Sequence, residues 1–462
     1  MEKSLDDTIA APGTRPGGSA IGIIKLSGTD SIKIADRVFK AKNNKKLRHS
    51  RTYTMTYGVI ENPEGGIIDE VLVSVMRKPS SYTREDVVEI NCHGGMEAAR
   101  SILELLLDAG ARLAEPGEFT RRAFLNGRID LSQAEAVIDL VQSKTRQSLE
   151  IAAHNLEGRV REEMGLLKKG ILEIITQLEA SVDFIEEDLQ LTPYDELKIR
   201  TGSILEKISK LIEDEKRGEI IKNGIRAAIV GKPNVGKSSL LNILLKKDRA
   251  IVTEIPGTTR DAIEETIYVD GIPLILVDTA GIRSTDDRIE KIGVDRSLKH
   301  IDEAELVVMV LDGSRELDEM DSAIIRKLEK KKNTVCCINK KDIGRKIDTG
   351  KIRTRFPAEN IIAISALYGQ GIEALENRIK CLVLDGETSL EEKVIVNARQ
   401  MEILKHVRGL LEKAAGSMEK GLSEEFPCSD LRIAYGRLGE ITGDSVGEDV
   451  LDKIFERFCI GK

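Results

Sequence analysis

The chain is 462 residues long, which is more than one compact core usually holds, so two to four domains are expected. Hydrophobic residues make up 41% and charged residues 32%, which is typical of a globular protein and argues against disorder. The net charge of −8 gives no sign of a generally basic nucleic-acid binder, so any contact with RNA must use a local patch. Neither a signal peptide nor a transmembrane segment is recognisable. The six cysteines are scattered without the spacing of a metal site or a disulfide framework. We therefore expect a cytoplasmic protein without membrane contact.

The sequence pattern changes three times along the chain. Residues 1–120 mix short strand-like runs with turn signals and one strong helix at 98–107, which predicts an α+β domain. Residues 121–221 carry Leu and Ile at three- and four-residue spacing, with one break near 192–193, and predict helices. Residues 222–383 alternate apolar strand candidates with amphipathic helices, which predicts an α/β domain with a mostly parallel sheet.

Helical periodicity returns over residues 384–462. We interpret the two helical stretches as one all-α domain into which the α/β domain is inserted, because the ends of a compact domain often lie close together. Two independent helical domains are the alternative.

Residues 231–238, GKPNVGKS, match the phosphate-binding pattern GxxxxGK[ST] and follow the strand candidate AAIV. The glycines let backbone N–H groups surround the phosphates of a nucleotide, and the following helix adds positive potential. The Lys237 ammonium can bind the β- and γ-phosphates, and the Ser238 hydroxyl can bind Mg²⁺. The residues predicted to bind nucleotide here are Asn234, Val235, Gly236, Lys237, Ser238 and Ser239.

Three further motifs end successive strand candidates in the order that a Ras-like GTPase requires: DTAG at 278–281, NKKD at 339–342 and SA at 365–366. The DTAG carboxylate can hold Mg²⁺ through water and its Gly amide can contact the γ-phosphate. The Asp342 carboxylate can accept from the guanine ring N–H and amine, which adenine lacks, and an SA amide can donate to the guanine carbonyl. The predicted contacts are Asp278, Thr279, Ala280, Gly281, Asn339, Lys340, Asp342, Ser365 and Ala366.

Between the first two motifs, residues 253–261, TEIPGTTRD, form a candidate switch loop. Thr259 is placed to bind Mg²⁺, and Ile282 stands where Ras-like proteins carry a water-orienting Gln, so another group must place the attacking water. The nucleotide contacts predicted in this loop are Thr253, Glu254, Ile255, Pro256, Gly257, Thr258 and Thr259.

The segments GKPNVGKSSLLN, IPGTTRD and FCIGK together resemble the MnmE (TrmE) family of tRNA modification GTPases, as do the opening DTIAAPGTRPGGSAIGIIKLSG and the stretch PGEFTRRAFLNGRIDLSQAEAV. The resemblance covers nearly the whole chain. It implies a folate-binding, dimerising α+β domain over 1–120, a helical domain over 121–221 and 384–462, and an inserted P-loop GTPase domain over 222–383.

The resemblance further implies GTP hydrolysis stimulated by potassium when two GTPase domains meet. Asn234 and the carbonyl groups of Thr253, Ile255 and Thr258 would hold K⁺, where it offsets charge between the phosphates. Glu290 would orient the attacking water; a solvated helix carboxylate is the alternative.

As a member of this family, the chain would be a homodimer that forms a heterotetramer with the flavoprotein MnmG. The complex would add a carboxymethylaminomethyl or aminomethyl group to C5 of the wobble uridine of certain tRNAs, with 5-formyl- or methylene-tetrahydrofolate as the carbon source. Matching motifs assign the folate contacts to Lys25, Glu85, Arg128 and Lys462. Lys25 stands where Arg is usual and Arg128 where Lys is usual, and Arg84 replaces a Gly. Cys459 would be the reactive thiol.

A ribosome-assembly or regulatory GTPase of the Era or Der type is the alternative function. Der-like proteins carry two P-loops, and this sequence has one. Era-like proteins place an RNA-binding KH module after the GTPase domain. Residues 436–439 fit its GxxG loop, but the flanking sequence is helical rather than strand-like.

Overall fold

The computed structural model describes residues 7–15, 17–183, 193–249, 265–277, 301–329, 331–344, 346–384, 386 and 393–462. The chain divides into two compact units, one formed by Met1–Gln142, Ala153–Glu206 and Glu402–Lys462, the other by Ser143–Ala152 and Lys207–Met401. Within the described ranges, none of the helices has both the length and the apolar character needed to cross a membrane.

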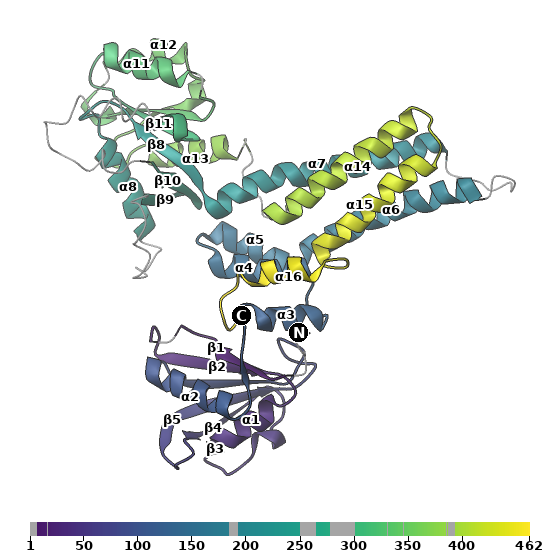
Figure 1. Ribbon diagram of the computed structural model, residues 1–462. Helices are drawn as coiled ribbons and strands as arrows, with labels where there is room; N and C mark the ends of the chain where they lie inside the picture. The colour runs from purple at the N-terminus through teal and green to yellow at the C-terminus, as the bar shows by residue number, and fades with distance from the viewer. Residues whose placement is uncertain are drawn as a thin grey trace. The chain divides into compact units, whose positions relative to one another are not determined.

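The first unit contains a seven-stranded sheet in the order β3-β4-β5-β6-β2-β1-β7. All neighbours are antiparallel except β1 and β7. Helices α1 (Ser31–Val38) and α2 (Met96–Asp108) bury their apolar residues against the strands, as Figure 1 shows. The strands are β1 (Ile9–Pro12), β2 (Ile21–Ser27), β3 (Phe39–Ala41), β4 (Thr54–Glu61), β5 (Ile67–Met76), β6 (Val87–His93) and β7 (Arg112–Leu113). The predicted α+β domain is confirmed.

Strand β5 shows how the sequence assigns the two faces of this sheet. Its side chains alternate, so that Val71, Val73 and Val75 are buried in the core while Leu72 is exposed on the opposite face. That opposite face therefore keeps apolar side chains at the surface.

Beyond this sheet the first unit is helical, and some of its helices also have residues in the second unit. Helix α15 (Glu425–Thr442) packs along α6 (Arg159–Asp183), as Figure 1 shows. The helices that follow the sheet in sequence are α3 (Glu118–Leu125), α4 (Leu131–Gln142), α5 (Arg146–Glu157), α6 (Arg159–Asp183) and α7 (Tyr194–Asn223). The C-terminal helices are α14 (Ala398–Glu419), α15 (Glu425–Thr442) and α16 (Glu448–Phe455). The predicted all-α class is confirmed.

The prediction of a single break near 192–193 was incomplete, because two more breaks occur between residues 131 and 183. Between α4 and α5, the Ser148 N–H donates to Thr145 Oγ1 at 3.1 Å and caps the new helix. Between α5 and α6, Gly158 takes a φ of 106°, which ends the first helix.

The second unit contains a six-stranded sheet in the order β13-β12-β11-β8-β10-β9. Every pair is parallel except β9 with β10, which confirms the mostly parallel sheet. The strands are β8 (Ile225–Val230), β9 (Glu265–Val269), β10 (Ile272–Leu276), β11 (Leu306–Asp312), β12 (Thr334–Asn339) and β13 (Ile361–Ala363). Its main helices are α8 (Lys237–Arg249), α11 (Glu319–Leu328), α12 (Thr349–Arg353) and α13 (Ile372–Val383). Strands β8, β11 and β12 are buried on both faces, as their continuous apolar runs predict.

Strand β9 was not among the predicted strands. It turns into β10 through Asp270 and Gly271, whose φ angles of 47° and 82° suit a tight hairpin. The Asp-Gly pair is the signal that could have revealed this antiparallel edge strand.

Candidate functional site

The turn at residues 231–236 joins β8 to α8, which begins at Lys237. Gly231 takes a φ of 152°, and a Cβ atom there would lie 2.3 Å from the Val310 carbonyl oxygen of β11. Asn234 has a left-handed φ of 62°, a conformation that Asn tolerates better than most residues. The loop therefore has the tight backbone turn before a helix N-terminus that phosphate binding requires.

The Lys237 ammonium lies across this turn. Its Nζ atom donates to the carbonyl oxygens of Gly231 at 2.8 Å and Lys232 at 2.7 Å. Burial lowers the pKa of Lys237. The two carbonyls hold the ammonium over the loop but carry no net charge. A phosphate group bound in the loop would supply the negative charge that offsets the ammonium.

Asn339, at the end of β12, connects the phosphate loop to the segment after β13. Its Nδ2 donates to the Val235 carbonyl at 2.8 Å, and its Oδ1 accepts from the Ala366 N–H at 2.9 Å. Asn339 is only 2% exposed. Three motifs that lie far apart in sequence thus meet at one buried amide, at the carboxyl ends of parallel strands, where α/β sheets bind ligands.

Gly236 permits this contact. A Cβ atom at Gly236 would lie 2.1 Å from Asn339 Nδ2, and its φ of 100° is strained for any other residue. The second glycine of the motif thus serves the Asn339 contact in addition to leaving space for phosphate.

The side chains predicted to recognise the base lie beside Asn339. Ser365 Oγ donates to Asp342 Oδ1 at 2.6 Å, which brings the NKKD and SA motifs together. Asp342 is exposed, so a bound base would itself have to cover the carboxylate. The Ala366 N–H, one candidate donor to the guanine carbonyl, is engaged by Asn339.

Lys340 has a structural partner that the motif did not reveal. Its backbone is left-handed, with a φ of 65°, and its Nζ lies 2.7 Å from the Asp312 Oδ2 atom at the end of β11. Burial by itself would raise the pKa of Asp312, but hydrogen bonds from Lys340 and Ser314 outweigh it and hold that pKa below its usual value. Lys340 therefore fixes its loop to a neighbouring strand.

Lys232 was not predicted as a site residue, yet it anchors the phosphate loop. Its Nζ lies 2.6 Å from Asp318 Oδ2 and 2.7 Å from Asp321 Oδ2. These two carboxylates form the capping box of α11. No sequence signal links Lys232 to a helix start almost ninety residues away.

Part of the predicted site lies outside the described residues. This part comprises the switch loop, the DTAG motif and the proposed water-orienting carboxylate: Thr253, Glu254, Ile255, Pro256, Gly257, Thr258, Thr259, Asp278, Thr279, Ala280, Gly281 and Glu290. Ser238 and Ser239 lie in the first turn of α8 and are exposed.

A second group of predicted residues lies in the first unit, where the C-terminal end of the chain reaches β1 and β2. Ile460 forms a bridge with Pro116, and a Cβ atom at Gly461 would lie 2.0 Å from the Pro12 carbonyl oxygen. Burial lowers the pKa of Lys25 and nearby Lys462 lowers it further, against the opposing effect of Glu89. Lys25 and Lys462, predicted from opposite ends of the chain, are therefore close in space.

Glu85 is held by buried groups. Ser27 Oγ donates to Glu85 Oε2 at 2.6 Å, and Arg122 Nη1 lies 3.3 Å from both carboxylate oxygens. Lys25 and Ser27 point to the same side of β2 because they are two residues apart. The Glu85 carboxylate is therefore held at Ser27, which is the next residue after Lys25 on this side of β2.

Arg128 stacks on an aromatic ring. Its guanidinium carbon lies 4.6 Å from the centre of the Tyr82 ring, a cation–π distance. Arg84 takes a left-handed φ of 60°, which explains why Gly suits this position, and its Nη1 donates to the Asn126 carbonyl at 3.0 Å.

Cys459 is exposed near the end of the chain. Its carbonyl oxygen accepts from the Lys462 N–H at 3.3 Å, and from the Gly117 N–H at 3.5 Å. These bonds fix the backbone of Cys459, which precedes Lys462 by three residues in the same C-terminal segment.

Comparison with known proteins gives consistent matches over almost the whole chain. The family model described as "MnmE helical domain" matches residues 131–459, and the model described as "GTP-binding protein TrmE N-terminus" matches residues 8–128. A tRNA modification GTPase MnmE of Thermoanaerobacter pseudethanolicus is 48% identical over 458 residues, which cover 99% of each chain. Another MnmE, from Clostridioides difficile, is 47% identical over 459 residues, which cover 99% of this chain and all of the relative.

Proposed function

Because the chain belongs to the MnmE family of tRNA modification GTPases, we propose that it is a potassium-stimulated GTPase that acts on tRNA. With the flavoprotein MnmG, in a heterotetramer, it adds a carboxymethylaminomethyl or aminomethyl group to C5 of the wobble uridine of certain tRNAs. The observation that carries the nucleotide part is the Asn339 amide, which joins the phosphate loop to the base-recognition segment. Full-length similarity to MnmE proteins favours this function over that of an Era or Der type of GTPase.

In GTP binding, the loop N–H groups and Lys237 hold the β- and γ-phosphates, while Asp342 accepts from the guanine edge. The residues proposed to hold Mg²⁺ are Thr259 and Ser238, an exposed residue in the first turn of α8. A bound Mg²⁺ neutralises charge on the phosphates.

We assign K⁺ to Asn234 together with the carbonyl groups of Thr253, Ile255 and Thr258. The exposed Asn234 supports this, because it lies within the phosphate loop with a left-handed backbone. The cation adds positive charge beside the phosphates, and Glu290 places the water.

Lys25, Glu85, Arg128 and Lys462 form the proposed folate site. The closeness of the two lysines suits the glutamate carboxylates of a tetrahydrofolate derivative, and Glu85 offers a carboxylate held by Ser27. Cys459 lies on the same tail, where its thiol could take part in the modification step.

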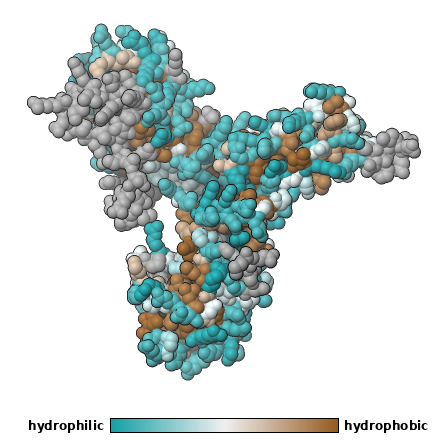
Figure 2. Space-filling model, viewed as in Figure 1, coloured by the Kyte–Doolittle hydropathy of each residue, from teal (hydrophilic) through white to brown (hydrophobic). Residues whose placement is uncertain are grey.

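A homodimer fits the open face of the N-terminal sheet. Exposed apolar side chains on this face include Ile21, Met55, Tyr57 and Leu72, and Tyr57 is the cross-strand partner of Leu72. Figure 2 shows hydrophobic residues at the surface of the part of the chain that contains this sheet. Exposed apolar patches of this kind mark protein interfaces, so we assign the face to a second copy of the chain.

The domain organisation that we propose is a folate-binding domain over 1–120, a helical domain over 121–221 and 384–462, and a GTPase domain over 222–383. The cytoplasm is the proposed compartment, since tRNA modification takes place where tRNA is used.

Two measurements test the proposal. GTP turnover by the purified protein should be at least about tenfold faster in KCl than in NaCl, because one well-placed charge contributes that much or more; equal rates would remove the potassium assignment. Mass spectrometry of tRNA nucleosides from a deletion strain should show loss of the modified wobble uridine, restored by the intact gene. Unaltered tRNA together with immature ribosomal subunits would instead support the Era or Der type.

A further inference from the structure

The N-terminal domain carries a dense cluster of positive charge in a chain whose net charge is −8. Residues 33–51, which we call the basic segment, contain eight Lys and Arg residues and a single acidic residue, Asp36. All eight are exposed: Lys33, Arg37, Lys40, Lys42, Lys45, Lys46, Arg48 and Arg51.

The basic segment is folded onto one surface. It runs from α1 through β3 to the short helix η1 (Leu47–His49), and the Asp36 carboxylate accepts from the backbone N–H groups of Leu47 at 2.6 Å and Arg48 at 3.2 Å. Arg77 holds the far end, with Nη2 donating to the Arg48 carbonyl at 2.7 Å. The cations are therefore displayed by an ordered backbone, and Arg77 adds another positive charge beside them.

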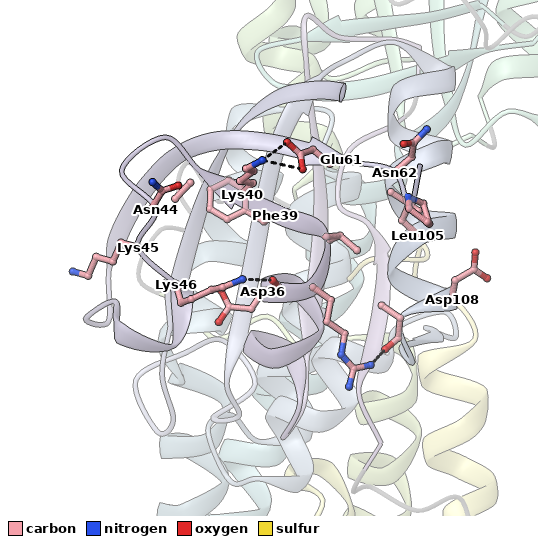
Figure 3. Close-up of a pocket in the computed structure, with 15 residues that line it drawn as sticks. Asp36, Phe39, Lys40, Asn44, Lys45, Lys46, Glu61, Asn62, Leu105 and Asp108 are labelled. Atoms are coloured by element: carbon pink, nitrogen blue, oxygen red, sulfur yellow. Dashed lines mark hydrogen bonds and ion pairs between the residues drawn. The ribbon is translucent and has the colours of Figure 1, made fainter. Parts of the chain in front are cut away.

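A cavity of about 690 Å³ lies beside the basic segment (Figure 3). Arg37, Lys40, Lys45 and Lys46 are among the residues that line it, and Figure 3 shows Lys45 extending away from the fold. Glu61 and Asp108 also line this cavity, so a polyanion is not expected to fill it. The favourable path for negative charge follows Lys45, Lys46, Arg48 and Arg51 instead.

Three of these eight cations pair with a carboxylate. Lys33 pairs with Asp30 at 2.7 Å, Lys40 with Glu61 at 3.2 Å and Lys42 with Glu70 at 3.5 Å, all exposed pairs of small energy. In the part of the chain that the structure describes, no ion pair is formed by the remaining five: Arg37, Lys45, Lys46, Arg48 and Arg51.

One alternative is that the lysines protect an edge strand from pairing with other chains, because β3 is at the edge of the sheet. That explanation covers Lys40 and Lys42, which lie on or next to β3. It does not cover Lys45, Lys46, Arg48 and Arg51, which follow the strand.

We propose that the basic segment is a docking surface for the sugar–phosphate backbone of tRNA. The inference rests on the proposed function, which makes tRNA the substrate. An RNA backbone is a regular polyanion, and exposed unpaired Lys and Arg bind it without reading its sequence. The surface thus accounts for RNA binding by a chain of negative net charge.

The test compares two variants with the same change in net charge. K45Q/K46Q/R48Q/R51Q neutralises the basic segment, and K207Q/K210Q/K413Q/K420Q neutralises four exposed lysines on or next to α7 and α14. The modification reaction is run with the partner flavoprotein, and tRNA affinity is measured by fluorescence anisotropy across KCl concentrations. Circular dichroism checks that both variants are folded.

For the first variant we expect the KM for tRNA to rise at least about tenfold, and the slope of log affinity against log salt to become shallower by about one for each phosphate that the variant no longer binds. GTP turnover should be unchanged, and the control variant should match the unaltered protein. If both variants change the KM for tRNA equally, or if the first variant does not change it, the basic segment is not a docking surface for tRNA. Either result would leave the proposed function intact. Normal tRNA affinity with loss of flavoprotein binding would assign the segment to an acidic protein instead. Absence of modification by the unaltered protein contradicts the proposed function itself.

Discussion

At the scale of single residues, the nucleotide site depends on one buried amide and the glycine that makes room for it. Asn339 spans from the Val235 carbonyl to the Ala366 N–H, while Gly236 leaves the space that its Nδ2 occupies. An unpaired buried amide costs about 1–3 kcal/mol, so this arrangement holds only while both contacts form. The phosphate loop and the segment after β13 are therefore coupled through Asn339.

Replacing Gly236 with Ala tests this coupling. The new methyl group would lie 2.1 Å from Asn339 Nδ2, so the loop or the amide must move. We expect the Kd for a fluorescent GTP analogue to rise at least about tenfold, which corresponds to about 1.4 kcal/mol. Gly409→Ala is the control, since a Cβ atom there meets nothing within 4 Å and Ala favours the α14 helix. Unchanged affinity of the Gly236 variant would show that Asn339 does not depend on this space.

The motif residues could be predicted from sequence, because their spacing and their positions at strand ends carry the signal. Their partners could not. Asp312 beside Lys340 and the Asp318–Asp321 pair around Lys232 come from other strands and helices, and no local pattern links them. Exposure of Asp342 was likewise invisible in the sequence.

At the scale of secondary structure elements, helix α11 supports the phosphate loop through its first turn. Asp318 caps the helix by accepting from the Asp321 N–H at 3.1 Å, and it also pairs with Lys232. The cap and the loop thus share one carboxylate. The buried parallel strands were predicted because continuous apolar runs identify them, whereas β9 was missed because its apolar side chains alternate with polar ones.

Replacing Asp318 with Ala should lower the free energy of local opening of α11 by about 0.5–2 kcal/mol through loss of the cap. Amide hydrogen exchange measures this, with Asp348→Ala as the control, because Asp348 caps α12 and forms no ion pair among the described residues. Only the Asp318 variant should also increase exchange in the phosphate loop. Equal exchange in the phosphate loop for both variants would mean that the Lys232–Asp318 ion pair does not stabilise this loop.

The same pair predicts a dependence on pH. Hydrogen bonds from Lys232 and from the Asp321 backbone lower the pKa of Asp318. A carboxyl group with a lowered pKa in the folded state stabilises that state above its ordinary pKa near about 4, and this contribution is lost as the pH falls. The difference between the unaltered protein and Asp318→Ala should therefore shrink as the pH drops below about 4; a constant difference would contradict the assignment.

At the scale of the whole molecule, the α+β, all-α and α/β parts of the chain can be predicted from the sequence. The apolar surface that the N-terminal sheet exposes cannot. Alternation in β5 predicts which side chains face outward, yet a strand pattern does not reveal that several neighbouring strands expose apolar side chains together. The open face, with Met55, Tyr57 and Leu72, follows only from the register of the sheet.

A Tyr57→Glu/Leu72→Glu variant tests the homodimer. Two carboxylates buried in an apolar interface cost several kcal/mol, so light scattering should give the 51.0 kDa mass of one chain, against twice that mass for the unaltered protein. Ile199→Glu, at an exposed apolar position on α7, should remain a dimer. A dimeric Tyr57→Glu/Leu72→Glu variant would exclude this face as the interface.

The most direct test of the central claim is calorimetric titration of the unaltered protein and Asp342→Asn with GTP, ATP and xanthosine triphosphate. A carboxylate matches the donors of guanine, whereas an amide can also donate to the additional carbonyl of xanthine. We predict that the unaltered protein binds GTP and rejects ATP, and that the variant loses GTP affinity while it gains affinity for xanthosine triphosphate. Equal binding of GTP and ATP, or an unchanged base preference in the variant, would contradict a guanine site at Asp342.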